Sequence, residues 1–170
     1  MPADRTRRQA KALSPDATRL LADDHREVQA LFENYRQLAD DGASGDDRGP
    51  LAEEICTLLT VHAALEEEIF YPAARAAGVD AGVLDEAEVE HASAKALIAQ
   101  IRDMVPDAPL YDAKVSVLGE YIDHHVGEEE GELFAKCRGS SMDLADLGAR
   151  IAARKDELMG EMAEGLEVVG

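Results

Sequence analysis

The sequence contains no tryptophan, and aromatic residues make up only 4% of its 170 residues. Hydrophobic residues still make up 46%, so a folded core has to be built mainly from Ala, Leu, Val and Ile. Such a composition is typical of helical bundles. A chain of this length is long enough for one domain with a well-buried core.

Basic residues are also scarce, because 17 Lys and Arg stand against 36 Asp and Glu, and the formal net charge is −19. Proteins bind nucleic-acid phosphates through a basic face, so we expect no nucleic-acid partner. The excess of acidic residues is compatible with cation binding, although most acidic residues of a folded protein simply form its solvated surface.

The chain has only two cysteines, Cys56 and Cys137, and they form no Cys-x-x-Cys pair. We interpret them as reduced thiols of a cytoplasmic protein. The stretch MPADRTRRQAKALSPD is polar and basic with no apolar run behind it, which predicts a disordered basic arm over residues 1–13 and no signal peptide. No stretch is long and apolar enough to cross a bilayer, so we expect no membrane partner.

Apolar residues recur at helical spacing along the rest of the chain, and no segment alternates as a strand would. The pattern predicts an all-α protein. Residues 14–137 should form an up-down-up-down four-helix bundle. An additional C-terminal helix over residues 141–164 should pack on the bundle or form an interface with a protein partner or a second copy.

The expected bundle helices are bounded by capping and helix-breaking residues. The first helix begins at Ser14-Pro15-Asp16, and a loop covers Asp40 to Pro50. The second helix runs from about Pro50 to Ala77. The third carries Leu84 to Val105 on its core stripe and ends at Pro106, and the fourth runs from about Leu110 to Lys136.

Two of these helices carry a histidine one turn before a glutamate. HAALEEEIFYP contains His62 and Glu66, and HHVGEEEGELF contains His125 and Glu129. Residues four apart on a helix point the same way, so each pair forms a two-pronged ligand set. Both pairs lie on apolar stripes without Lys or Arg, where a carboxylate is costly unless a cation accompanies it. The sequence therefore predicts bound metal ions, and imidazole with carboxylate suits iron, manganese or zinc.

His25 and His91 lie on the apolar stripes of the first and third helices. When residues are counted from the helix ends at about 1.5 Å each, these two and the histidines of the two pairs fall on one level of the bundle. A single histidine on an apolar face is usually a hydrogen-bonded core residue. Four histidines at matching depth, two of them with a glutamate one turn on, favour a metal centre instead.

His124 and Glu128 have the same spacing as His125 and Glu129. The neighbours of His125 at the core-facing offsets are apolar, whereas those of His124 would place two acidic residues in the core. We therefore choose His125 and Glu129 as the ligand pair of the fourth helix.

The order and spacing of His25, His62 with Glu66, His91, and His125 with Glu129 resemble the hemerythrin-like, or HHE cation-binding, domain over about residues 16–137. The resemblance implies a four-helix bundle that holds two iron ions joined by an oxo or hydroxo group. It implies that His25 and His62 bind one iron, that His91 and His125 bind the other, and that Glu66 and Glu129 bridge them.

The chain departs from the oxygen-carrying hemerythrins at two positions. Their third helix has a second histidine one turn after the first, where this chain has Lys95, and their last helix has an aspartate five residues after its histidine, where this chain has Glu129 four residues on. The missing ligand predicts an open position at the metal pair, which favours chemistry or sensing over reversible dioxygen transport. Lys95 either donates a hydrogen bond at the site or extends to solvent. Tyr121 is either a packing residue or a phenol beside the metals.

We therefore expect a di-iron protein that binds or reacts with a small oxygen species, namely dioxygen, hydrogen peroxide or nitric oxide. Catalase-like peroxide removal is the enzymatic version, with no catalytic residue beyond the metal ligands. The alternative is an iron- or oxygen-sensing protein without turnover, whose stability depends on metal occupancy. Iron storage is a third reading, and it requires many irons per chain.

Overall fold

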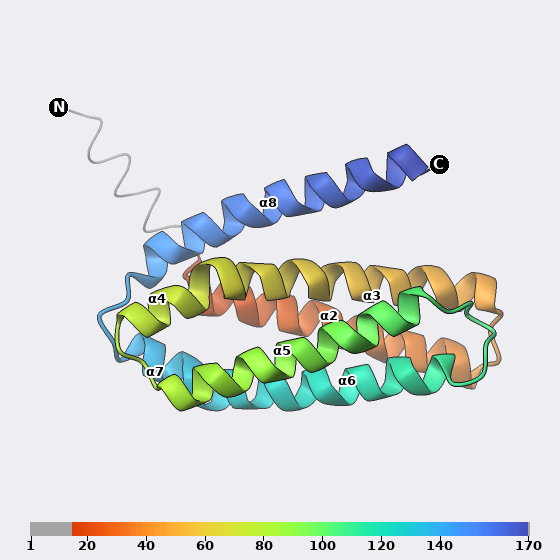
Figure 1. Ribbon diagram of the computed structural model, residues 1–170, viewed down its shortest axis with the longest axis horizontal. Helices are drawn as coiled ribbons and strands as arrows, with labels where there is room; N and C mark the ends of the chain where they lie inside the picture. Colours follow the sequence, from red (N-terminus) through yellow and green to blue (C-terminus); the bar gives the residue numbers. More distant parts are fainter. Residues whose placement is uncertain (1–14, 170) are drawn as a thin grey trace.

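The computed structural model describes residues 15–169, and within them every regular element is helical (Figure 1). The elements are α2 (Ala17–Asp40), α3 (Gly45–Leu65), η1 (Glu66–Phe70), α4 (Tyr71–Ala76), α5 (Ala81–Arg102), α6 (Tyr111–Glu128), η2 (Glu129–Leu133), α7 (Phe134–Arg138) and α8 (Leu144–Val169). α3, η1 and α4 follow one another without a break and form one rod, and α6, η2 and α7 form another. With α2 and α5 these rods make the four-helix bundle that the sequence predicted, and α8 is the additional C-terminal helix.

α2 begins at Ala17, directly after the predicted start at Ser14-Pro15-Asp16. The Asp16 carboxylate caps the helix, because it accepts hydrogen bonds from the backbone N–H of Arg19 at 3.1 Å and the Thr18 hydroxyl at 2.6 Å. The basic arm expected over residues 1–13 lies outside the described residues. α8 starts at this end of the bundle and runs along its outside (Figure 1). Its Gly148 lies so close to α2 that a Cβ there would be 2.4 Å from the Pro15 carbonyl oxygen.

The second bundle helix begins at Gly45, not at Pro50 as predicted, so the loop before it is shorter. Residues 45–50 looked like a loop because they contain two glycines and a proline. Acidic residues are favourable in the first turn, where Asp46 and Asp47 lie, whereas Pro50 lies inside the helix and supplies no backbone N–H donor there. Arg48 also fixes this turn from inside, through hydrogen bonds to the carbonyl oxygens of Ala43 and Pro106.

The third bundle helix, α5, ends at Arg102, and the prediction that Val105 lies on its core stripe was wrong. The Val105 side chain is 68% exposed. Proline disfavours the helical conformation of the residue before it, so the chain leaves the helix before Pro106 rather than at it.

The core consists of two apolar clusters with a polar layer between them. One cluster contains Leu21, Leu65 and Ala87, and the other contains Val28, Leu59 and Ala94. The histidines of α2, α3 and α5 lie between these residues in the sequence, at His25, His62 and His91. Within the described part of the chain, no helix has the length and apolar character that a bilayer span requires.

Candidate metal centre

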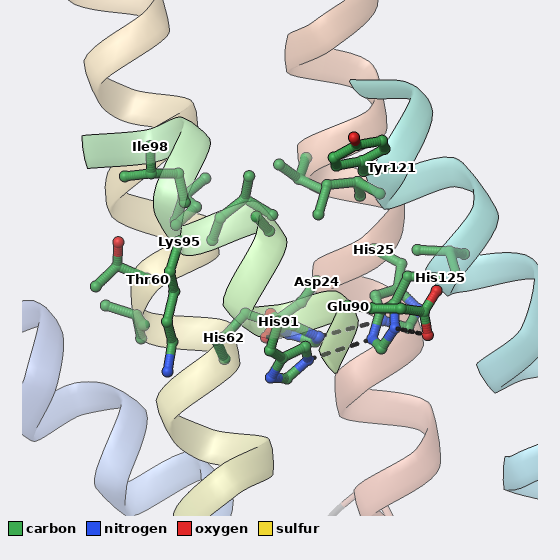
Figure 2. Close-up of a pocket in the computed structure, with 18 of the residues that line it drawn as sticks. Asp24, His25, Thr60, His62, Glu90, His91, Lys95, Ile98, Tyr121 and His125 are labelled. Atoms are coloured by element: carbon green, nitrogen blue, oxygen red, sulfur yellow. Dashed lines mark hydrogen bonds and ion pairs between the residues drawn. The ribbon is translucent and has the colours of Figure 1, made fainter. Parts of the chain in front are cut away.

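The structure brings His25, His62, His91 and His125 together (Figure 2). They come from α2, α3, α5 and α6, one from each of the four helices of the bundle. The Nε2 atoms of His25 and His62 lie 3.2 Å apart, and those of His91 and His125 lie 3.4 Å apart. All four side chains are buried. The histidines therefore form two close pairs, one on α2 and α3 and the other on α5 and α6.

Glu66 and Glu129 lie between the two histidine pairs and face both. Glu66 Oε1 is in contact with His62 Nε2, and Glu66 Oε2 lies 3.5 Å from His91 Nε2. Glu129 Oε1 lies 3.3 Å from His25 Nε2, and Glu129 Oε2 lies 3.1 Å from His125 Nε2. Each carboxylate thus offers one oxygen to each pair, which is the arrangement needed to bridge two metal ions.

These carboxylates lack the donors that buried acceptors normally have. Glu66 is fully buried and Glu129 is 2% exposed. Both oxygens of Glu66 and Oε1 of Glu129 have no hydrogen-bond partner within the described residues. A buried charged acceptor is costly unless a donor or a cation faces it. The ligand atoms form two groups, and within each group they lie within 4.8 Å of one another. The first group is His25, His62, Glu66 and Glu129, and the second is Glu66, His91 and His125. The residues present therefore fit a pair of metal cations.

A short π-helical segment begins at each of the two glutamates, η1 at Glu66 and η2 at Glu129. In both, the backbone N–H five residues on bonds to the glutamate carbonyl, from Tyr71 in η1 and from Phe134 in η2. Proline is not the common cause, because Pro72 follows the first segment while Ala135 has the corresponding place after the second. Single π turns inside α-helices are frequent at functional sites.

The π turns bring Tyr71 and Phe134 onto the side of the metal centre. The Tyr71 hydroxyl donates to Glu129 Oε2 at 2.7 Å, and the Phe134 ring stacks on His25. Sequence reasoning missed Tyr71, because five residues after Glu66 an ordinary α-helix has turned to another face. Tyr121, considered as a phenol beside the metals, is 47% exposed and lies apart from the histidines (Figure 2).

Four further carboxylates face the outer nitrogens of the histidines. The Nδ1 atoms of His62, His125, His25 and His91 lie 3.0, 3.3, 3.6 and 3.8 Å from Asp24, Glu90, Glu130 and Glu67, respectively. Asp24 and Glu90 hydrogen-bond to His62 and His125, and outer carboxylates of this kind orient a metal-binding imidazole so that its other nitrogen points inward. Nδ1 of His25 and of His91 has no hydrogen-bond partner within the described residues.

Two lysines compensate two of these outer carboxylates. Lys95 Nζ lies 2.6 Å from Glu67 and its side chain is 52% exposed, so it supplies no ligand in place of the missing histidine. Lys155, on α8, lies 2.6 Å from the Asp24 carboxylate that faces His62. The C-terminal helix therefore contacts a residue directly beside the histidine cluster.

The buried histidines and carboxylates shift each other's pKa values. Burial lowers the pKa of His62, but the charge of Glu66 and the hydrogen bond to Asp24 outweigh it and raise the value to about 10. Burial also lowers the pKa of His125, whereas Glu129 and Glu66 raise it to about 12. Burial raises the pKa of Glu66, yet the histidines, His62 first, hold it well below its usual value. Protons on the imidazoles thus balance the carboxylates, and a bound cation displaces them.

A cavity of about 50 Å³ adjoins the histidines (Figure 2). Apolar side chains from four helices line most of it, among them Val28, Leu59, Ile98 and Ile122. This is room for a few water-sized molecules. The arrangement is therefore an anionic, histidine-rich centre beside a small apolar chamber.

Fold and site together define a helical-bundle protein with a buried His and Glu centre for metal cations. The model of the Hemerythrin HHE cation binding domain family matches residues 16–137, and the chain belongs to this family. The matched region contains all six buried His and Glu residues and stops short of α8.

The chain is also similar to curated proteins and to a solved structure. The chain is 32% identical over 150 residues to a DNA nickase of Nostoc sp., and it spans only 41% of that protein's length. It is 24% identical over 138 residues to the uncharacterized protein Rv2633c of Mycobacterium tuberculosis, a match that covers 79% of this chain and 84% of that protein. A crystal structure of a Hemerythrin HHE cation binding domain-containing protein, the Rv2633c homolog from Mycobacterium kansasii, has a TM-score of 0.75 at 22% identity and covers 90% of this chain and 93% of that one. This likeness shows the shared fold.

Proposed function

We propose that this cation-binding domain holds two iron ions and reacts with a small oxygen species, with catalase-like removal of hydrogen peroxide as its activity. The observation that carries the proposal is the position of Glu66 and Glu129. Each offers one oxygen to each of two histidine pairs, and three of their four oxygens have no hydrogen-bond partner within the described residues. A bundle core with such inward-facing Glu and His residues is a known setting for paired iron or manganese ions.

The proposed ligand sets follow the two histidine pairs. His25 and His62 would hold one ion, and His91 and His125 would hold the other. Glu66 and Glu129 would bridge the two ions. The ligand chemistry suits iron and also accepts manganese or zinc, so the metal itself is part of the proposal.

Bound iron would supply redox chemistry that exchanges two electrons with peroxide across the pair. In the overall reaction one hydrogen peroxide molecule is reduced to water while another is oxidised to dioxygen, so no further reductant is needed. The chain's own groups keep the site dry and admit only small molecules, because apolar residues such as Val28 and Ile122 line the adjoining cavity. The Tyr71 hydroxyl fixes one Glu129 oxygen by donating to it.

DNA nicking, the activity for which the Nostoc relative is named, is not proposed for this chain. More than half of that protein lies outside the match. A net charge of −19 also opposes contact with DNA phosphates, which a nicking enzyme has to make.

Elemental analysis of protein purified in air without added metal is the first test. We expect two irons per chain and rapid dioxygen evolution when peroxide is added. Glu66→Gln should abolish both. Glu120→Gln, which removes one exposed charge from α6, is the matched control and should retain both. Zinc in place of iron, no metal after reconstitution with ferrous iron, or an iron-loaded protein that leaves peroxide intact would each contradict the proposal.

A second candidate, iron or oxygen sensing without turnover, is favoured by one contact. Lys155 of α8 binds Asp24, and Asp24 in turn accepts a hydrogen bond from His62. A change at His62 can therefore reach a helix that lies outside the matched family region. If sensing is the function, hydrogen exchange in α8 should slow when metal binds, and the loaded protein should leave peroxide unchanged. Equal exchange in both states would exclude this role.

A further inference from the structure

The sequence contains a third His-x-x-x-Glu motif, His124 with Glu128, that the core centre does not use. His124 Nε2 lies 3.2 Å from Glu128 Oε1 and 3.8 Å from Glu90 Oε2, which comes from α5. The ligand atoms of the three residues lie within 4.8 Å of one another. The His124 side chain is 68% exposed, so a cation in solution can reach this group directly.

Glu90 connects this surface group to the core centre, because its two oxygens face two different histidines. Oε2 faces His124, and Oε1 lies 3.3 Å from Nδ1 of the core ligand candidate His125. A crevice of about 10 Å³ is lined by Glu90 and Glu128 of this group together with His125 and Glu129 of the core centre. Glu129 is 2% exposed, and its Oε1, which lies 3.3 Å from His25 Nε2, has no hydrogen-bond partner within the described residues. Two carboxylates of the surface group and two core ligand candidates therefore line the same crevice.

An ordinary ion pair at this spacing on an exposed helix surface contributes little to the stability of a protein. The third residue makes this group different, because Glu90 brings a second carboxylate from another helix toward the same imidazole. One imidazole nitrogen and two carboxylate oxygens form a mixed ligand set that suits divalent iron, manganese or zinc. The site is open to water, and its three ligands are fewer than those of the core centre, so it should release a cation more readily.

We propose that Glu90, His124 and Glu128 form a surface binding site that captures a divalent transition-metal cation and passes it to the core centre. The delivery role rests on the proposed function of the core, whereas the binding role does not. The acidic surface raises the local cation concentration, and Glu90 is the residue that changes partner because it faces both sites.

Equilibrium dialysis with zinc tests the surface site. Wild-type protein should bind one more zinc per chain than His124→Ala, and Glu128→Gln should show the same loss. Glu120→Gln removes the same charge from the same helix and should match the wild type. Because the core residues are identical in all four proteins, the difference counts the surface site alone, whatever the core binds. Equal zinc content in wild type and His124→Ala would overturn the proposal.

Anaerobic loading with ferrous iron at limiting concentration tests delivery. We expect His124→Ala to fill its core several-fold more slowly, because the variant removes the imidazole ligand that holds the captured cation. Its final core iron content and its far-ultraviolet circular dichroism should equal those of the wild type. An unchanged loading rate would overturn delivery. A wild-type core that takes up no iron would instead contradict the proposed function, and the zinc comparison would still decide the surface site.

Discussion

Arg48 and Glu66 are both buried charged side chains of the rod that begins with α3, yet they find their counter-charges in different ways. The Arg48 guanidinium donates to the carbonyl oxygens of Ala43 and Pro106 and forms ion pairs with Asp107 and Asp112. All of its partners belong to the chain. Glu66 is fully buried, lies against the four histidines of the centre, and has no hydrogen-bond partner on either oxygen within the described residues.

This difference separates a structural charge from a binding site. Arg48 ties the start of α3 to the segment between α5 and α6, and its interactions are complete without a ligand. The charges of the carboxylates in the metal centre are balanced only by imidazoles. Their inner nitrogens can release a proton and bind a metal ion instead. Substitutions at the two places should therefore change different quantities, namely stability for Arg48 and metal content for Glu66.

The largest effect is expected for Glu66→Gln. This variant removes the bridging charge from both histidine pairs, so metal content should fall from the wild-type value to near zero. Metal at about a hundred times its dissociation constant stabilises a folded protein by about 2.7 kcal/mol, which for a chain of this size is roughly 5–10 °C in Tm. Calorimetry with and without ferrous iron should show this gain for the wild type and for Glu120→Gln, and none for Glu66→Gln. A full gain in Glu66→Gln would show that the carboxylate is not needed to hold metal.

A smaller effect is expected for Arg48→Met, which should lower the stability of the fold and leave the metal content unchanged. Losing hydrogen bonds to charged and carbonyl acceptors should cost about 2 kcal/mol and lower Tm by roughly 4–8 °C. Metal content per chain should stay at the wild-type value, because Arg48 contacts no residue of the metal centre. Arg36→Met is the control, since Arg36 makes only an exposed ion pair with Glu33 and its loss should change stability by no more than about 0.5 kcal/mol. Loss of metal from Arg48→Met would contradict the separation.

The sequence predicted which His and Glu residues lie together in the core, and it did so for a physical reason. Residues four apart on a helix share a face, so His62 with Glu66 and His125 with Glu129 are visible as ligand pairs without a structure. The level of the four histidines follows from counting along antiparallel helices. The resemblance to the HHE domain supplied the bridging roles, which spacing alone does not give.

Features that depend on contacts between distant segments could not be predicted. The two π segments have the sequences EEEIF and EEGEL, which share only their leading glutamates. Tyr71 was missed because it reaches Glu129 only through such a turn. Arg48 was placed in a loop, because its partners near Pro106 and Asp112 come from another part of the chain. In each case tertiary structure decides the local conformation.

Asp16 gives the smallest of these effects and completes the comparison, because it is a carboxylate with donors of its own. Burial raises the pKa of Asp16, but the hydrogen bonds from Thr18 and from the backbone N–H of Arg19 outweigh it and hold the value below 3.8. A folded-state pKa below the unfolded value means that the carboxylate stabilises the protein above that pH range. This stabilisation is lost as the pH falls through the folded-state pKa.

Asp16→Ala should therefore cost about 1 kcal/mol at neutral pH, the usual contribution of a helix N-cap, with metal content unchanged. The difference from the wild type should shrink as the pH is lowered through the folded-state pKa of Asp16, because the wild-type carboxylate then becomes protonated. Asp16→Asn retains a capping oxygen and should lose much less at neutral pH. Urea unfolding of the three metal-free proteins across this range measures these differences. A cost for Asp16→Ala that stays constant down to the lowest pH would mean that the ionised carboxylate is not what caps α2.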